Sequence, residues 1–128
     1  KFFIHFAYPG VSGYLHIGHM RGFTYCDIFA RYKRMTGYNV LFPAGFHASG
    51  IPSIGFAKKV ERKDPLTIKI LKEYGCNDVL INKLKDPNEV VNYFSKIYVD
   101  DFWKKIGLLI YDSRIMSTIL IDYKKFIT

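Results

Sequence analysis

The chain has few cysteines and no long apolar run. Its two cysteines, Cys26 and Cys76, lie 50 residues apart, and neither belongs to a C-x-x-C or a Cys/His cluster. No zinc site or other metal site built from protein ligands is therefore expected. No apolar run approaches the roughly 18 residues that a membrane-spanning helix needs, so no span is expected. Unpaired cysteines and the lack of a signal-peptide pattern predict a cytoplasmic protein.

Two common nucleotide-binding motifs are also missing. The chain contains neither the G-x-x-x-x-G-K-[ST] of P-loop enzymes nor the G-x-G-x-x-G of dinucleotide enzymes. Acidic residues are scarce in the first 60 positions, where Asp27 is the one acid beside all four histidines. The whole chain holds 19 Lys and Arg against 11 Asp and Glu, for a net charge of +8. This balance suits a polyanion such as ATP or nucleic acid, although a solvated basic surface would give the same numbers.

The first half has the pattern of a parallel α/β unit. A short apolar run over residues 1–8 predicts a buried strand. Apolar residues at helical spacing predict a helix over residues 16–35, with Gly37 just beyond its end. Residues 38–42 (YNVLF) predict a second strand that Pro43 ends. Together these elements predict a βαβ unit.

Two glycine-bearing loops follow the carboxyl ends of the predicted strands. Residues 9–13 follow the first strand, and residues 45–52 follow the second. Ligands of open parallel sheets bind outside these carboxyl ends. Both loops are therefore expected to face one crevice.

The second half is predicted to be mostly helical. Asp, Asn and Pro residues that typically begin helices, together with Gly residues that end them, predict the following elements: helices over residues 53–63, 66–74, 77–84 and 89–106, and a weak strand over residues 108–111. Tyr123–Thr128 has the pattern of an unfinished helix. We therefore expect the 128 residues to be a fragment of a larger domain.

His16 and His19, at the expected start of the first helix, give the strongest functional signal. They are three residues apart and so share a helix face, at a terminus that attracts anions. Gly18 between them lets a ligand approach the backbone closely. Ring N–H groups in these positions can stabilise the charge that develops during attack on the α-phosphorus of ATP. Two ordinary helix histidines would give the same spacing, but the preceding strand and turn favour a phosphate site.

His47 lies in the second crevice loop, between Gly45 and Gly50. A neutral imidazole there can accept a hydrogen bond from a substrate ammonium group. It can equally cap a backbone group of its own loop. The sequence leaves these two interpretations open.

Three segments resemble a known enzyme family. Residues 6–21 (FAYPGVSGYLHIGHMR) resemble the first signature of class I aminoacyl-tRNA synthetases. Residues 27–43 resemble the leucine, isoleucine and valine subgroup, and residues 45–50 (GFHASG) are most similar to the archaeal-type leucyl enzymes. The second family signature, Lys-Met-Ser-Lys-Ser, is absent, and we expect it further along, with the editing and anticodon-binding regions.

The resemblance implies a Rossmann-like parallel sheet with helices on both faces. Residues 1–128 would be the N-terminal part of its ATP-binding catalytic domain. The implied activity is activation of leucine by ATP, accompanied by Mg²⁺, to leucyl-adenylate, followed by transfer to tRNA(Leu). The fragment alone is expected to be weakly active or inactive. The implied catalytic residues are His16 and His19; the implied ATP-binding residues are Tyr8, Pro9, Gly13, His16, Gly18 and His19; and the implied amino-acid-binding residues are Ala7, Tyr8, Gly10 and His47.

Three alternatives remain at this stage. Gly10 stands where many leucyl enzymes carry an aromatic residue, so another synthetase of the isoleucine, valine and leucine group fits the same pattern. A nucleotidyltransferase outside translation can also carry an H-x-G-H phosphate site. A non-catalytic paralogue that binds RNA would explain the basic balance and the many aromatic residues.

Overall fold

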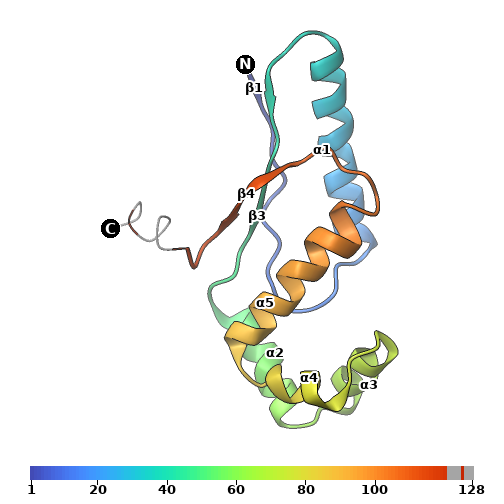
Figure 1. The fold of residues 1–128 in the computed structure, drawn as a ribbon, viewed down its shortest axis with the longest axis vertical. Coiled ribbons are helices and arrows are strands. Elements are labelled where there is room, and N and C mark those ends of the chain that lie inside the picture. The colour runs from blue at the N-terminus through green and yellow to red at the C-terminus, as the bar shows by residue number, and fades with distance from the viewer. Residues whose placement is uncertain (121–124, 126–128) are drawn as a thin grey trace.

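The computed structural model describes residues 1–120 and residue 125. It is an α/β structure in which short parallel strands precede and follow helices (Figure 1). The predicted start of a helix over Tyr123–Thr128 lies outside the described residues, apart from Lys125.

The predicted βαβ unit is confirmed. Strand β1 (Phe2–Phe3) leads to helix α1 (Ile17–Met35), which returns to strand β2 (Val40–Leu41). β1 and β2 are parallel. β1 is much shorter than the predicted strand over residues 1–8, because its ladder with the returning chain ends at the bond from the Ile4 N–H to the Leu41 carbonyl. Exposed and half-buried residues alternate over residues 1–8, so the prediction that this segment is fully buried was wrong.

A second parallel pair joins β3 (Pro43–Phe46) to β4 (Tyr111–Ser117). Pro43 begins β3, so the prediction that it ends a strand was wrong. A first strand position tolerates the missing N–H of proline, and here the ladder uses the carbonyl of Phe42, which accepts from the Tyr111 N–H at 2.7 Å. The register shifts between Pro43 and Gly45, and the described strands form two short sheets.

β4 begins later than the predicted strand over residues 108–111. Side chains of α1 bind the backbone at Leu109 instead: Asp27 accepts from its N–H at 2.9 Å, and Arg34 donates to its carbonyl at 3.0 Å. These bonds take the backbone groups that a strand would use. Ladder pairing therefore starts only at Tyr111.

The predicted helices of the second half are confirmed, with shifted ends. Asp64, Asn77 and Asp86 cap three of them by accepting from backbone N–H groups, each at 2.9 Å. The predicted helix over residues 89–106 is divided, because its C-terminal part winds as a π-helix. The elements are α2 (Ile51–Glu61), α3 (Pro65–Glu73), α4 (Asp78–Lys83), α5 (Pro87–Ile97) and the π-helix η1 (Tyr98–Trp103).

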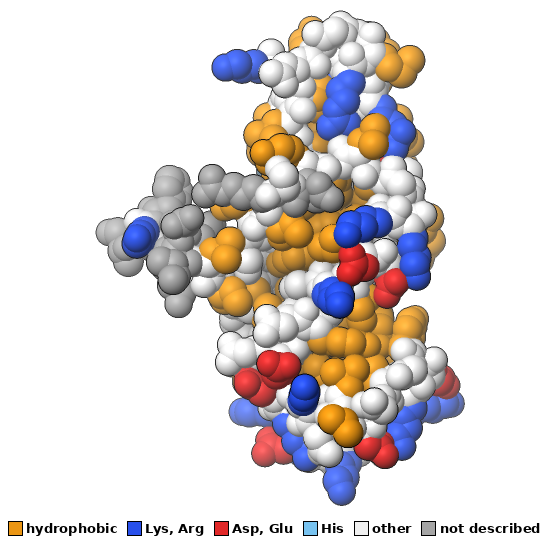
Figure 2. All heavy atoms as spheres, viewed as in Figure 1, with side chains coloured by type: hydrophobic (Ala, Val, Ile, Leu, Met, Phe, Trp, Pro, Cys, Tyr) orange, Lys and Arg blue, Asp and Glu red, His pale blue; other side chains and the backbone are white. Residues whose placement is uncertain are grey.

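One aromatic core connects the strands to the helices of the second half. Phe46 of β3 stacks on Trp103 of η1 with ring centroids 5.1 Å apart, and Phe23 of α1 meets Trp103 edge-on at 5.6 Å. Figure 1 shows the strands and α1 toward one end, α2, α3 and α4 at the other, and α5 running between them. Figure 2 shows apolar side chains exposed along the middle of one face and charged side chains gathered at the α2–α4 end.

Asp27 ties α1 to the segment before β4. It is 6% exposed and accepts from the Arg31 Nε at 2.6 Å and from the Leu109 N–H at 2.9 Å. We expect Asp27→Ala to lower the free energy of unfolding by about 2 kcal/mol, since the Leu109 N–H and the Arg31 guanidinium lose a buried acceptor. Denaturant unfolding measures this.

Lys105→Ala is the matched control for this prediction. It breaks an exposed pair with Asp101, at 2.6 Å and also four residues apart. It should cost less than about 1 kcal/mol. Equal losses in the two variants would contradict the role given to Asp27.

Candidate functional site

A cleft of about 300 Å³ lies where the glycine turn, the start of α1 and the start of α2 meet. η1, from the other half of the chain, contributes Tyr98 to the lining of this cleft. Both predicted catalytic histidines line this cleft, as do two of the predicted glycines. Its lining residues are Gly10, Ser12, Gly13, Tyr14, His16, His19, Pro52 and Tyr98.

His16 and His19 cap α1 reciprocally. The Nδ1 of His16 accepts from the Gly18 N–H at 3.1 Å, and the Nδ1 of His19 accepts from the His16 N–H at 3.4 Å. The two ring centroids are 4.1 Å apart. The arrangement is a capping box in which imidazoles replace the usual hydroxyl and carboxylate. The predicted convergence of the two rings is thus present.

These bonds fix where each neutral ring carries its proton. A ring nitrogen that accepts a hydrogen bond is unprotonated, so the proton of each neutral imidazole lies on Nε2. Each ring therefore keeps one N–H donor that the helix cap does not use. Two such donors, beside the free N–H groups of a helix start, suit an anion.

The electrostatics of the helix start also favour an anion. The first turn of α1 contains no acidic residue, so no carboxylate of that turn offsets the positive end of the helix dipole. Partial burial lowers the pKa of His19, and the neighbouring His16 lowers it further. His19 is therefore neutral at physiological pH and donates without carrying a charge.

Glycine is required at two positions around this helix start. Gly13 has φ +148°, a conformation that residues with a side chain rarely adopt. A Cβ on Gly18 would lie 2.9 Å from the Cε1 of His16, so a side chain there would displace the ring. The sequence predicts that Gly18 leaves space for a ligand. The structure shows that the His16 ring also occupies the space beside Gly18.

The two predicted crevice loops are joined. The His47 N–H donates to the Pro9 carbonyl at 3.0 Å, and the Val11 N–H donates to the His47 carbonyl at 3.2 Å. The Oγ1 of Thr118 accepts from the backbone N–H groups of Ala48 and Ser49, both at 3.0 Å. The second loop begins after Phe46 rather than at Gly45, because Gly45 and Phe46 belong to β3.

The remaining predicted residues surround the cleft without lining it. Tyr8 covers Gly45 so closely that a Cβ there would lie 2.4 Å from the tyrosine ring. Pro9 is buried, whereas Ala7, Gly18 and His47 are exposed. The structure therefore brings Gly10, Gly13, His16 and His19 into one cleft, and it places the other candidates in the segments next to it.

Sequence reasoning missed two tyrosines: Tyr98, which binds the turn backbone, and Tyr14, which packs beside it. The Tyr98 hydroxyl donates to the carbonyls of Gly10 and Gly13. The Tyr14 ring stacks on Tyr74 with centroids 3.7 Å apart, and its hydroxyl lies 3.1 Å from that of Tyr93. These partners are 60 to 88 residues apart in the chain, so no local pattern reveals them.

The described residues contain no group of three or more His, Cys, Asp or Glu side chains that could hold a metal ion. Cys26 and Cys76 are both free thiols. Within the same residues, no helix is long and apolar enough to cross a membrane.

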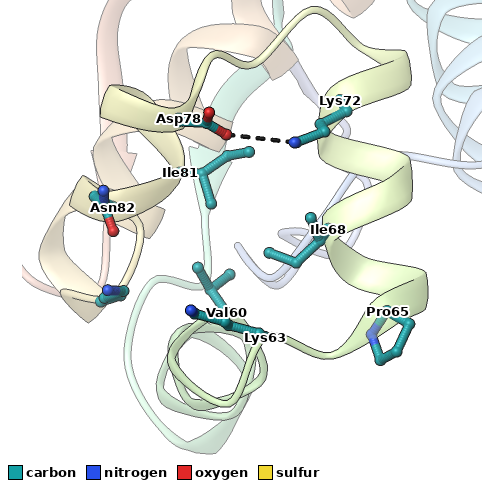
Figure 3. A pocket seen from close by; sticks show the side chains of 9 residues that line it. Val60, Lys63, Pro65, Ile68, Lys72, Asp78, Ile81 and Asn82 are labelled. Atoms are coloured by element: carbon teal, nitrogen blue, oxygen red, sulfur yellow. Dashed lines mark ion pairs between the residues drawn. The ribbon is translucent and has the colours of Figure 1, made fainter.

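A larger hollow of about 490 Å³ lies among α2, α3 and α4, away from the histidines (Figure 3). Val60 of α2, Ile68 of α3 and Ile81 of α4 point into it, and the Lys72–Asp78 pair, at 3.4 Å, spans one side. None of the predicted site residues lines it. Size alone therefore does not identify the site for a phosphate ligand, and the smaller cleft is the better candidate.

Comparison with known proteins identifies the family. Residues 1–116 match the model for "tRNA synthetases class I (I, L, M and V)", and the chain belongs to this family. It is 47% identical to a leucine–tRNA ligase of Nanoarchaeum equitans over 93% of this chain and 12% of that protein. It is 43% identical to a leucine–tRNA ligase of Thermoplasma acidophilum over 99% of this chain and 14% of that protein.

A solved structure shares the fold. It is the ternary complex of Agrobacterium radiobacter K84 agnB2 LeuRS, tRNA and LeuAMS, with a TM-score of 0.65 and 23% identity. The match covers 99% of this chain and 14% of that one. The chain thus spans about an eighth of the length of the relatives that it matches.

The lowered pKa of His19 can be tested by NMR titration of the ring. Because the fold favours the neutral form, we expect His19 to gain its proton only at a pH below the ordinary value of 6.5. His16→Asn removes one of the two causes, so the His19 midpoint should rise in that variant. A midpoint at or above 6.5 in the unaltered protein would contradict the described environment.

Proposed function

We propose that this chain is the N-terminal part of the ATP-binding catalytic domain of a leucine–tRNA ligase. The enzyme would activate leucine with ATP to leucyl-adenylate and then transfer leucine to tRNA(Leu). The observation that carries the proposal is the pair of reciprocally capped imidazoles in the cleft at the start of α1. Family membership and the similarity to archaeal leucine–tRNA ligases support it.

The proposed phosphate site uses donors that the fold has already oriented. The leucine carboxylate attacks the α-phosphorus, a new P–O bond forms, and the bond to the leaving pyrophosphate breaks. Negative charge grows on the phosphate oxygens during this step. The Nε2–H groups of His16 and His19 and the N-terminus of α1 would stabilise that charge, since preorganised donors act most strongly where charge develops.

Mg²⁺ would accompany ATP. No carboxylate of the described residues lines the cleft, so the residues present fit a metal carried by the phosphates rather than by the protein. Bound there, Mg²⁺ would neutralise phosphate charge. Tyr8, Pro9, Gly13 and Gly18 would complete the nucleotide site around the two histidines.

The amino-acid subsite is proposed next to the phosphates, on Ala7, Tyr8, Gly10 and His47. No atom of the described part of the chain lies within 4 Å of a Cβ built on Gly10, so this position leaves room for a substrate side chain. His47 is exposed and fixed by backbone bonds to the turn. It would accept a hydrogen bond from the leucine ammonium group.

The complete protein would extend this fold. We propose that the short parallel pairs are part of a Rossmann-like sheet with helices on both faces, which later segments complete. The second signature, the editing region and the anticodon-binding region would belong to those later segments. The fragment alone would then be weakly active or inactive, and the full-length enzyme would act in the cytoplasm.

ATP–pyrophosphate exchange by the full-length protein, measured with each of the 20 amino acids, tests the proposed function. We expect exchange with leucine above all others. His16→Ala should lower kcat by about 100-fold or more, since one lost transition-state donor costs roughly 2.7–4 kcal/mol. The KM for ATP should change much less.

His5→Ala is the control for this measurement, since His5 is an exposed histidine outside the cleft lining. It should leave exchange near the unaltered rate. Absence of exchange with leucine would refute the assignment, and preference for isoleucine or valine would move the protein to another member of the group.

Gly18→Ala separates catalysis from helix stability. Alanine is a better helix former than glycine by about 1 kcal/mol, which offsets the weakened His16 cap, so the stability of α1 should change little. The added methyl would nonetheless meet the His16 ring at 2.9 Å, and we expect at least about a 10-fold loss of exchange activity from the misplaced donor.

Gly55→Ala, in α2 with nothing within 4 Å of the new Cβ, is the matched control and should keep full activity. Equal activity of the two alanine variants would show that the His16 ring position is not needed.

A further inference from the structure

Tyr98 connects the second half of the chain to the turn that precedes the catalytic histidines. It is the first residue of η1 and is 1% exposed. Its hydroxyl donates to the carbonyl of Gly13 and lies 3.2 Å from the carbonyl of Gly10, which also accepts from it. One buried phenol thus holds both ends of the turn over residues 10–13.

This turn needs an external constraint. It contains two glycines, and glycine has more backbone freedom than any other residue. Gly13 holds a conformation at φ +148° that its own sequence does not enforce. The chain runs from Gly13 to His16 in three residues, so a change in the turn moves the start of α1. Local sequence alone does not fix where the two imidazoles sit.

The phenol itself is rigidly placed. Its ring packs against Phe46 of β3 at 5.8 Å and Phe94 of α5 at 6.5 Å between centroids. Burial raises the pKa of Tyr98 to about 12, although the backbone of Ser12 opposes this rise. The hydroxyl therefore stays protonated and remains a donor throughout the physiological pH range.

We propose that Tyr98 is a positioning residue for adenylate formation: its hydroxyl sets the shape of the turn so that His16 and His19 meet the phosphates of ATP. Tyr98 acts through the turn backbone and not on the reacting atoms. This inference rests on the proposed function. Tyr98 lies outside the signature over residues 6–21. Its bonds to the turn give a reason why the helical second half belongs to the same unit as the proposed phosphate site.

Tyr98→Phe in the full-length protein tests the inference, because it removes one oxygen and leaves the ring packing in place. We expect kcat for leucine-dependent ATP–pyrophosphate exchange to fall by about 10- to 100-fold, the loss that a misplaced catalytic group produces. The KM for ATP should stay within about threefold, because ground-state binding is not the target. Hydrogen exchange of the backbone over residues 9–15 should become faster.

Tyr93→Phe is the matched control. It removes a hydroxyl from α5 that is bonded to the side chains of Tyr14 and Cys76 and not to the turn backbone. The Tyr14 ring remains stacked on Tyr74, so Tyr14 keeps its place without this bond. This variant should lose thermal stability comparably but keep kcat within about twofold of the unaltered protein. A purely structural role for Tyr98 would make the two variants alike in kcat, and that result would overturn the inference.

The two proposals fail in different ways. If the unaltered full-length protein shows no leucine-dependent exchange, the proposed function is wrong. Amide hydrogen exchange over residues 9–15 still tests whether Tyr98 holds the turn in that case. Unchanged protection in Tyr98→Phe overturns this role, and faster amide exchange than in Tyr93→Phe supports it. If exchange activity is present and Tyr98→Phe leaves it unchanged, only the inference about Tyr98 is refuted.

Discussion

The rest of the site depends on the reciprocal hydrogen bonds at the start of α1. Each of two imidazoles accepts a backbone N–H through Nδ1, and this one arrangement has two consequences. It satisfies N–H groups that a helix start would otherwise leave unpaired, and it orients both rings with Nε2–H as the remaining donor. The same residues are therefore a helix cap and the core of the proposed anion site.

Long-range contacts hold this helix start in place. Tyr98 binds the turn carbonyls, and the Tyr14 ring stacks on Tyr74, the residue that follows α3. The stack of Phe46 on Trp103 joins the strands to η1. The helical second half thus supports the segment that carries the proposed phosphate site.

Much of this organisation could be predicted from sequence where the cause is local. The caps at Asp64, Asn77 and Asp86 and the strand–turn–helix around His16 follow from neighbouring residues, and all are present. Strand limits were wrong where distant groups decide them: Asp27 binds the backbone at Leu109 and delays β4. Tyr98 was missed for the same reason, since its partners lie 85 and 88 residues away.

A crystal structure of the full-length protein with ATP and a non-reacting leucine analogue tests the central claim most directly. The measured quantity is the distance from each imidazole Nε2 to the nearest phosphate oxygen. The reciprocal cap predicts that both rings lie within hydrogen-bond distance, about 2.7–3.2 Å, with their Nδ1 atoms still bound to the helix backbone. Phosphates bound elsewhere, such as in the hollow among α2, α3 and α4, would contradict the claim.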